Sequence, residues 1–132
     1  MARNTLARPR PLEMLLVDLD GVLRLYDQQT PFRTEVLFEL DPGILRRTAF
    51  SREIINAVIT GKKTKEEWIE HVGALVDSPI AVRRWLSEPG VINKRVFKAI
   101  HQVRLTGAKV AVLTNGTSNT RREMYELSLI HI

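Results

Sequence analysis

The sequence predicts an α/β fold in which a parallel sheet carries an inserted block of helices. Two short apolar segments, residues 12–18 and 109–113, have the length and composition of buried parallel strands. An amphipathic segment at 93–106 precedes the second strand and supplies the helix of a strand–helix–strand unit. Residues 27–88 have a helical pattern and are too many for a simple crossover, so we expect them to form an inserted subdomain.

The chain begins with a basic arm. Residues 1–11 include Pro9 and Pro11 and show no apolar periodicity, so we expect this segment to be flexible. The first strand follows directly, and Asp20-Gly21 predicts the turn by which the chain leaves that strand.

Four or five short helices are expected in the inserted block. Ser51 is suited to cap one of them, and Thr64 with Glu67 forms a capping box at the start of another. The expected helices occupy residues 34–40, 42–50, 51–61, 64–76 and 79–86. Their inward side chains are expected to be Ile54, Ile55, Val58, Ile59, Trp68, Ile69, Val72, Leu75, Val76, Val82 and Trp85.

The pattern changes after Pro89-Gly90. Residues 93–106 have apolar positions on one helical face, and Gly107 is suited to end this helix. The second strand then ends in a turn at 114–116, and another helix is expected from Thr117. The inward positions of the 93–106 helix are Val96, Phe97, Ile100 and Val103.

These elements divide the chain into two units. The sheet unit comprises residues 12–26 and 89–126, and it contains only about two strands of a parallel sheet. The helical block comprises residues 27–88, which lie between the two parts of the sheet unit.

Composition excludes several functional classes. The 132 residues are 44% hydrophobic, which is enough for one domain with a core. No apolar run reaches the roughly 18 residues of a spanning helix, and the first residues lack a signal core, so we expect a cytoplasmic protein without a membrane partner. The absence of cysteine excludes a disulfide scaffold, a thiolate zinc site and a cysteine nucleophile.

The net charge of +5 is unevenly distributed. Residues 1–10 and 89–122 contain ten of the 20 basic residues and no acid, whereas all 15 acids lie elsewhere. A basic surface can indicate nucleic-acid binding. Because aromatic residues make up only 6% of the chain and no nucleic-acid motif is present, we do not expect a nucleic acid to be the partner.

Two polar segments directly follow the predicted strands. Asp18 ends the first strand and Asp20 lies two residues further on, so extended geometry would point both to the same side, and Thr114 with Asn115 follows the second strand. Open α/β sheets bind ligands at this carboxyl edge. Paired carboxylates suit Mg²⁺, nucleophilic attack on phosphorus and proton transfer, and the hydroxyl and amide can donate to a phosphate. Each segment alone is also typical of an ordinary turn, and the presence of both favours a site.

These segments resemble motifs of a known enzyme family. The sequence Asp-Leu-Asp-Gly-Val-Leu at 18–23, with the strand before it, resembles motif I of the haloacid dehalogenase superfamily. Residues 112–115 resemble motif II, and the helical block is similar to the α-helical cap inserted after motif I in the first subclass. The resemblance covers residues 12–126 and implies a Rossmann-like parallel sheet.

The resemblance implies a role for each polar residue. Asp18 would be the nucleophile that becomes an aspartyl-phosphate, and Asp20 the general acid and base, with its backbone carbonyl helping to hold Mg²⁺. Thr114 and Asn115 would hold the phosphoryl group. Because haloacid dehalogenases lack an acid at the position of Asp20, the resemblance implies a Mg²⁺-dependent phosphatase acting on a small phosphorylated metabolite. Arg24 either contacts an anionic substrate or makes a packing or ion-pair contact.

Two further motifs of the family are not found in these 132 residues. A lysine and an acidic pair would follow motif II, but no lysine follows Lys109 and Asp77 is the last aspartate. We therefore expect a C-terminally truncated fragment that is inactive by itself. Residues 127–132 resemble the translation of a sequencing adapter, which predicts a non-native tail. The alternative is a native apolar tail that packs on the core.

Three alternative functions remain compatible with these features. A phosphomutase of the same family would share the site residues, a non-catalytic module would bind Mg²⁺ and phosphate, and a basic protein would bind nucleic acid. Product analysis, binding without turnover and salt-dependent binding to DNA or RNA would distinguish them. No pattern in the sequence predicts an oligomeric state.

Overall fold

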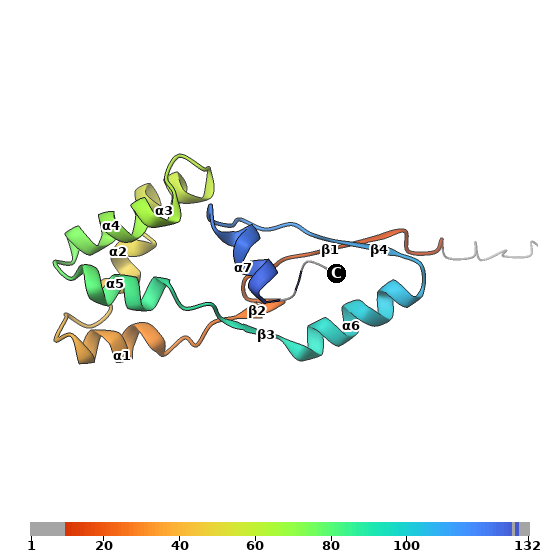
Figure 1. Ribbon diagram of the computed structural model, residues 1–132, viewed down its shortest axis with the longest axis horizontal. Coiled ribbons are helices and arrows are strands. Elements are labelled where there is room, and N and C mark those ends of the chain that lie inside the picture. The colour runs from red at the N-terminus through yellow and green to blue at the C-terminus, as the bar shows by residue number, and fades with distance from the viewer. Residues whose placement is uncertain (1–9, 128, 130–132) are drawn as a thin grey trace, which may run out of the picture.

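The computed structural model describes residues 10–127 and Leu129. The architecture is mixed α/β, with a group of helices at one end and a small parallel sheet at the other (Figure 1). In chain order the elements are β1 (Met14–Val17), β2 (Arg24–Leu25), α1 (Thr30–Leu37), α2 (Ile44–Ala49), α3 (Arg52–Ile59), α4 (Lys65–Leu75), α5 (Pro79–Leu86), β3 (Val91–Ile92), α6 (Lys94–Leu105), β4 (Lys109–Val112) and α7 (Thr120–Glu126). Within the described part of the chain, no helix is long and apolar enough to cross a membrane.

The parallel pair predicted from the two apolar segments is present. β1 pairs with β4 in parallel, with Val17 opposite Val112. The prediction that these strands are buried is wrong for one face of β1, where Met14 and Leu16 are 50% and 57% exposed. A face that no helix or strand covers stays open to solvent, even when its side chains are apolar.

A short antiparallel pair joins the two units, and the sequence did not predict it. In β2 and β3, Arg24 lies opposite Ile92 and Leu25 opposite Val91, so the two connections to the helical block run side by side (Figure 1). Two-residue strands are too short to show a recognisable alternation of polar and apolar residues. Gly90 is required here, because a Cβ would lie 2.9 Å from the carbonyl oxygen of Leu25 and the backbone has a φ of +74°.

Local sequence signals predicted most of the helix boundaries in the helical block to within a few residues. The capping box is present, with the Thr64 hydroxyl accepting from the Glu67 amide at 3.2 Å and the Glu67 carboxylate accepting from the Thr64 amide at 2.7 Å. The first helix begins at Thr30 instead of residue 34, because Pro31 occupies its first turn, where a proline costs no helical hydrogen bond.

The buried apolar side chains form two separate clusters. The larger cluster lies within the helical block and consists of Leu45, Ala49, Ile54, Val58, Trp68, Ile69, Val72, Val76, Val82 and Trp85. The smaller cluster lies in the sheet unit and consists of Val17, Leu19, Leu23, Ile100 and Leu129. Because the two clusters share no residue, each unit has its own apolar core.

Three side chains that helical spacing predicts to be inward are exposed. Ile59 and Leu75 of the helical block are 39% and 56% exposed, and Phe97 of α6 is 39% exposed. Each lies on the apolar side of its helix, but the neighbouring elements are too few to cover the whole of that side. In α6, for example, only Ile100 is buried.

The start of the last helix also differs from expectation. The last helix begins at Thr120, three residues later than expected, because the Thr120 hydroxyl first accepts from the Thr117 amide at 2.8 Å in a turn. Leu129 is 1% exposed and packs in the smaller cluster, and the non-native tail stays a prediction. The other residues of the predicted tail after Leu127, and residues 1–9 of the predicted arm, lie outside the described residues.

Candidate active site

The parallel register brings three of the predicted site residues to one edge. Leu113 donates its amide to the carbonyl of Val17 at 2.9 Å, which extends the ladder by one residue past the end of β4. The residues that follow the two strands therefore leave the sheet side by side. Asp18, Thr114 and Asn115 line one open cleft at this edge, although the first two lie 96 positions apart in the sequence.

Asp18 presents an exposed carboxylate at this edge. Its Oδ1 accepts from the amide of Leu19 at 2.7 Å, a contact that orients the carboxylate next to the strand end. Leu19 itself is fully buried and anchors the turn, because its carbonyl accepts from the amides of Leu23 and Arg24 at 2.9 and 2.8 Å. The carboxylate is thus held by a rigid turn and remains open to a ligand.

Asp20 lies on the other side of this turn. β1 ends at Val17 and a turn begins at Leu19, so the alternation that would point Asp18 and Asp20 the same way does not continue. Asp20 lines a separate cavity between the sheet unit and the helical block. Asn115 lines both the cleft of Asp18 and the cavity of Asp20, and so connects the two hollows.

Arg24 is the most buried charged side chain of the site. Its exposed fraction is 2%, its Nε lies 2.6 Å from Oδ1 of Asp20, and its guanidinium lies over the ring of Tyr26, 5.1 Å from the centroid. Burial disfavours the charge, but hydrogen bonds to Asp20 and Glu123 outweigh that effect and raise the pKa of Arg24 above its ordinary value. Of the two roles that the sequence left open, the structure shows an ion pair.

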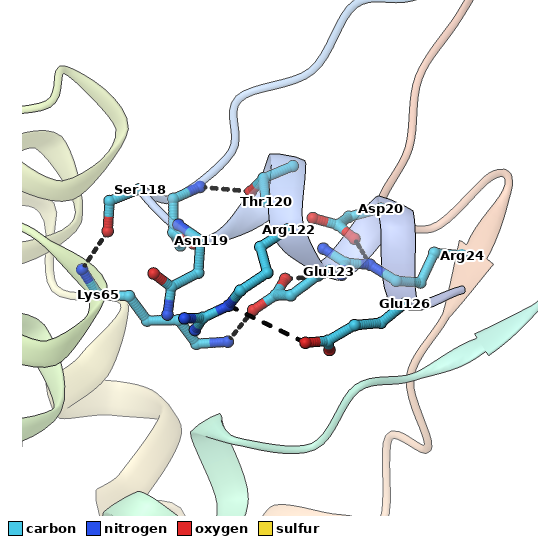
Figure 2. A network of polar contacts seen from close by, with 10 residues as sticks. Asp20, Arg24, Lys65, Ser118, Asn119, Thr120, Arg122, Glu123 and Glu126 are labelled. Carbon is cyan, nitrogen blue, oxygen red and sulfur yellow. Dashed lines mark hydrogen bonds and ion pairs between the residues drawn. The ribbon is translucent and has the colours of Figure 1, made fainter. Parts of the chain in front are cut away.

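Two residues of this network were not identified from the sequence. Glu123 of α7 accepts from Nη1 of Arg24 at 2.8 Å and from Nζ of Lys65 at 2.5 Å (Figure 2). Lys65 begins α4, and its amide also donates to the hydroxyl of Ser118 at 2.9 Å. No local pattern could have paired Lys65 with Glu123, because 58 positions separate them and each resembles a solvated helix residue.

The electrostatics of this network favour the charged form of Glu123 and the neutral form of Tyr26. Burial alone would raise the pKa of Glu123, but the hydrogen bonds from Lys65 and Arg24 lower it below its ordinary value. Burial, reinforced by the negative charge of Asp20, raises the pKa of Tyr26. Asp20, Arg24, Glu123 and Lys65 therefore form a chain of alternating charges from the turn after β1 to the helical block.

The side chains at the strand edge suit Mg²⁺ better than a metal ion that takes all of its ligands from the protein. No group of three or more His, Asp or Glu side chains that could hold a metal ion occurs among residues 10–127 and 129. Mg²⁺ keeps several waters and commonly takes one or two carboxylates. The exposed carboxylate of Asp18 meets that requirement, while Oδ1 of Asp20 is already bound to Arg24.

No match to this chain was found among the models of known protein families or among the curated proteins. A functional assignment therefore depends on the site residues and their arrangement.

Proposed function

We propose that this chain is part of a Mg²⁺-dependent phosphatase that hydrolyses a small phosphate monoester through an aspartyl-phosphate. One observation carries the proposal, namely that the parallel pairing of β1 and β4 gathers Asp18, Thr114 and Asn115 in one cleft. A carboxylate beside hydroxyl and amide donors is the set of groups that attack on phosphorus needs. The resemblance of residues 18–23 and 112–115 to two motifs of the haloacid dehalogenase superfamily supports the same assignment.

In the first half-reaction, an oxygen of Asp18 attacks phosphorus and the bond from phosphorus to the ester oxygen breaks. The leaving oxygen takes a proton from Asp20, and Thr114 and Asn115 donate to the phosphoryl oxygens as negative charge shifts among them. Because Arg24 holds Oδ1 of Asp20, Oδ2 is the oxygen that would carry this proton.

In the second half-reaction, water replaces Asp18 on phosphorus. Asp20 removes a proton from the water, the bond from phosphorus to Asp18 breaks, and phosphate leaves with both carboxyl groups restored. Mg²⁺, held by the Asp18 carboxylate and the Asp20 carbonyl, would supply charge neutralisation at the phosphoryl group. The chain has no lysine after Lys109, so we propose that the remaining neutralising groups lie outside these 132 residues and that this chain alone does not turn over.

The proposal is tested by reading the coding DNA past the codon for Glu126 and expressing the longer frame. We expect Mg²⁺-dependent release of phosphate from monoesters, and loss of at least about a thousandfold in kcat for Asp18→Asn. Asp41→Asn, an exposed aspartate of the helical block, serves as the matched control and should retain full activity. Normal turnover by Asp18→Asn would disprove the mechanism, and clear turnover by the 132-residue chain would disprove the need for further groups.

A phosphomutase would use the same residues, and product analysis separates the two reactions. A hydrolase releases inorganic phosphate, whereas a mutase returns the phosphoryl group to another hydroxyl of the product. A binding module is the second candidate, because Asp20 lines a different cavity from Asp18 and its Oδ1 is bound to Arg24. It predicts that the longer protein binds Mg²⁺ and phosphate without turnover.

A further inference from the structure

A cavity of about 250 Å³ lies where the helical block meets the sheet unit. Its volume is below the roughly 300–1,000 Å³ of typical small-molecule sites, so its occupant is small. Residues from both units line the cavity. It therefore lies between the two apolar cores and is not a packing defect within either core.

The wall on the side of the helical block contains an aromatic patch beside polar residues such as Gln28, Arg46 and Glu88. Phe50 packs edge-on against Trp68 and Trp85, with ring centroids 5.9 and 6.0 Å away. Both tryptophans are buried, and the Trp68 indole donates to the carbonyl of Ala49 at 3.1 Å, which fixes that ring. Phe50 itself is 49% exposed, so a large part of its ring lacks a packing partner within the described chain. Val58 and Ile59 extend this apolar patch.

The wall on the side of the sheet unit is polar. Asp20, Asn115 and Thr117 line it, and Asn115 also lines the cleft that contains Asp18. A molecule can therefore lie with one end in the cleft beside Asp18 and the other end against the aromatic patch. The boundary between the two ends falls at Asn115 and Asp20, where the proposed reaction breaks its bond.

We infer that the substrate is a phosphate monoester whose leaving group is a flat apolar ring. This inference rests on the proposed function for the position of the phosphate, and on the aromatic patch for the leaving group. Aromatic rings favour edge-on or offset packing against other rings, and apolar surface without a partner gains most from such an occupant. A polyhydroxylated leaving group would lose hydration wherever it lay against the exposed ring of Phe50.

Tryptophan fluorescence can report binding in this cavity. Its only two tryptophans, Trp68 and Trp85, both line the cavity, so their fluorescence responds to an occupant. We would titrate this chain, with Mg²⁺ present, with phenyl phosphate, glycerol 2-phosphate, inorganic phosphate and phenol. We expect phenyl phosphate to bind at least about tenfold more tightly than glycerol 2-phosphate, because a single methylene in an apolar pocket already gives about that factor.

A matched pair of variants locates the binding. Ile59→Gln places an amide in the apolar patch and should remove most of the tenfold preference for the phenyl ester. Ile80→Gln, at an exposed position of α5 that does not line the cavity, should leave the preference unchanged. Circular dichroism of both variants checks that each is folded.

The outcomes separate the inference from the proposed function. Equal affinity for phenyl phosphate and glycerol 2-phosphate, with both weakened by Asn115→Ala, would overturn the ring inference and leave the phosphatase proposal standing. Equal affinity for phenol and phenyl phosphate, with neither affected by Asn115→Ala, would support a ring site and count against the phosphatase proposal. No fluorescence response to any ligand would overturn the inference.

Discussion

The carboxylate of Glu123 lies 2.8 Å from the guanidinium of Arg24, and both side chains are largely shielded from solvent. The second oxygen of Glu123 contacts the ammonium of Lys65, so one acid in α7 bridges a cation of the sheet unit and a cation of the helical block. Removal of one partner from such a buried group leaves charge without compensation, which costs more than the ion pair itself contributes.

Glu123→Ala is therefore expected to lower the free energy of unfolding by about 3 kcal/mol. Urea unfolding followed by tryptophan fluorescence measures this change. Glu126→Ala, in the same helix, is the matched control, because its pair with Arg122 is exposed and 4.0 Å long, and it should change stability by less than about 0.5 kcal/mol. Equal effects of the two substitutions would show that the buried network contributes no more to stability than an exposed ion pair does.

The same contact predicts how stability depends on pH. The pKa of Glu123 is lower in the folded chain than its ordinary value of 4.5, so the folded state binds fewer protons than the unfolded state below that pH. The stabilisation is complete above pH 4.5 and is lost as the pH falls through the folded pKa. We expect the stability of Glu123→Gln to decline less between pH 5 and pH 3, about two units, than that of the parent chain. Parallel profiles would contradict the assignment.

Local patterns predicted the parts of the fold that depend on neighbouring residues. The two strands of the parallel pair, β1 and β4, were visible as short apolar runs, and the capping box at Thr64 was visible as two residue types at fixed spacing. The gathering of Asp18, Thr114 and Asn115 at one edge follows from strand direction alone, since parallel strands end at the same edge.

Contacts between distant segments could not be predicted in the same way. Nothing near Lys65 or Glu123 in the sequence indicates that they meet, because their pairing depends on how the helical block sits on the sheet unit. Periodicity also predicted Leu75 and Phe97 to be inward, although both are exposed. A pattern identifies the apolar side of a helix, but it does not show whether another element covers every residue on that side.

Two helix starts test what a capping side chain contributes. The hydroxyl of Thr64 accepts from the Glu67 amide at the start of α4, whereas Ser51 at the start of α3 makes no such hydrogen bond with its side chain. Thr64→Ala should lower the free energy of unfolding by about 1 kcal/mol, and Ser51→Ala by much less. Thermal and urea unfolding of both variants measure the difference. A larger loss for Ser51→Ala would contradict the role given to the Thr64 hydroxyl.

Adjacent residues of β1 test whether one face of the sheet is open to solvent. Leu16 is 57% exposed, while Val17 is 8% exposed and belongs to the core of the sheet unit. Val17→Thr buries a hydroxyl and should lower the free energy of unfolding by about 1–3 kcal/mol. Leu16→Thr should change it by less than about 0.5 kcal/mol, because threonine keeps the strand preference and its hydroxyl stays hydrated.

The open face also predicts the behaviour of the chain at high concentration. Met14 and Leu16 expose apolar surface on a strand that has only one partner among the described residues, and such surfaces favour association between molecules. Leu16→Thr should therefore reduce self-association in sedimentation velocity, while Val17→Thr should not. If Leu16→Thr instead destabilised the chain as much as Val17→Thr, the face that contains Leu16 would have to be packed against another surface in solution.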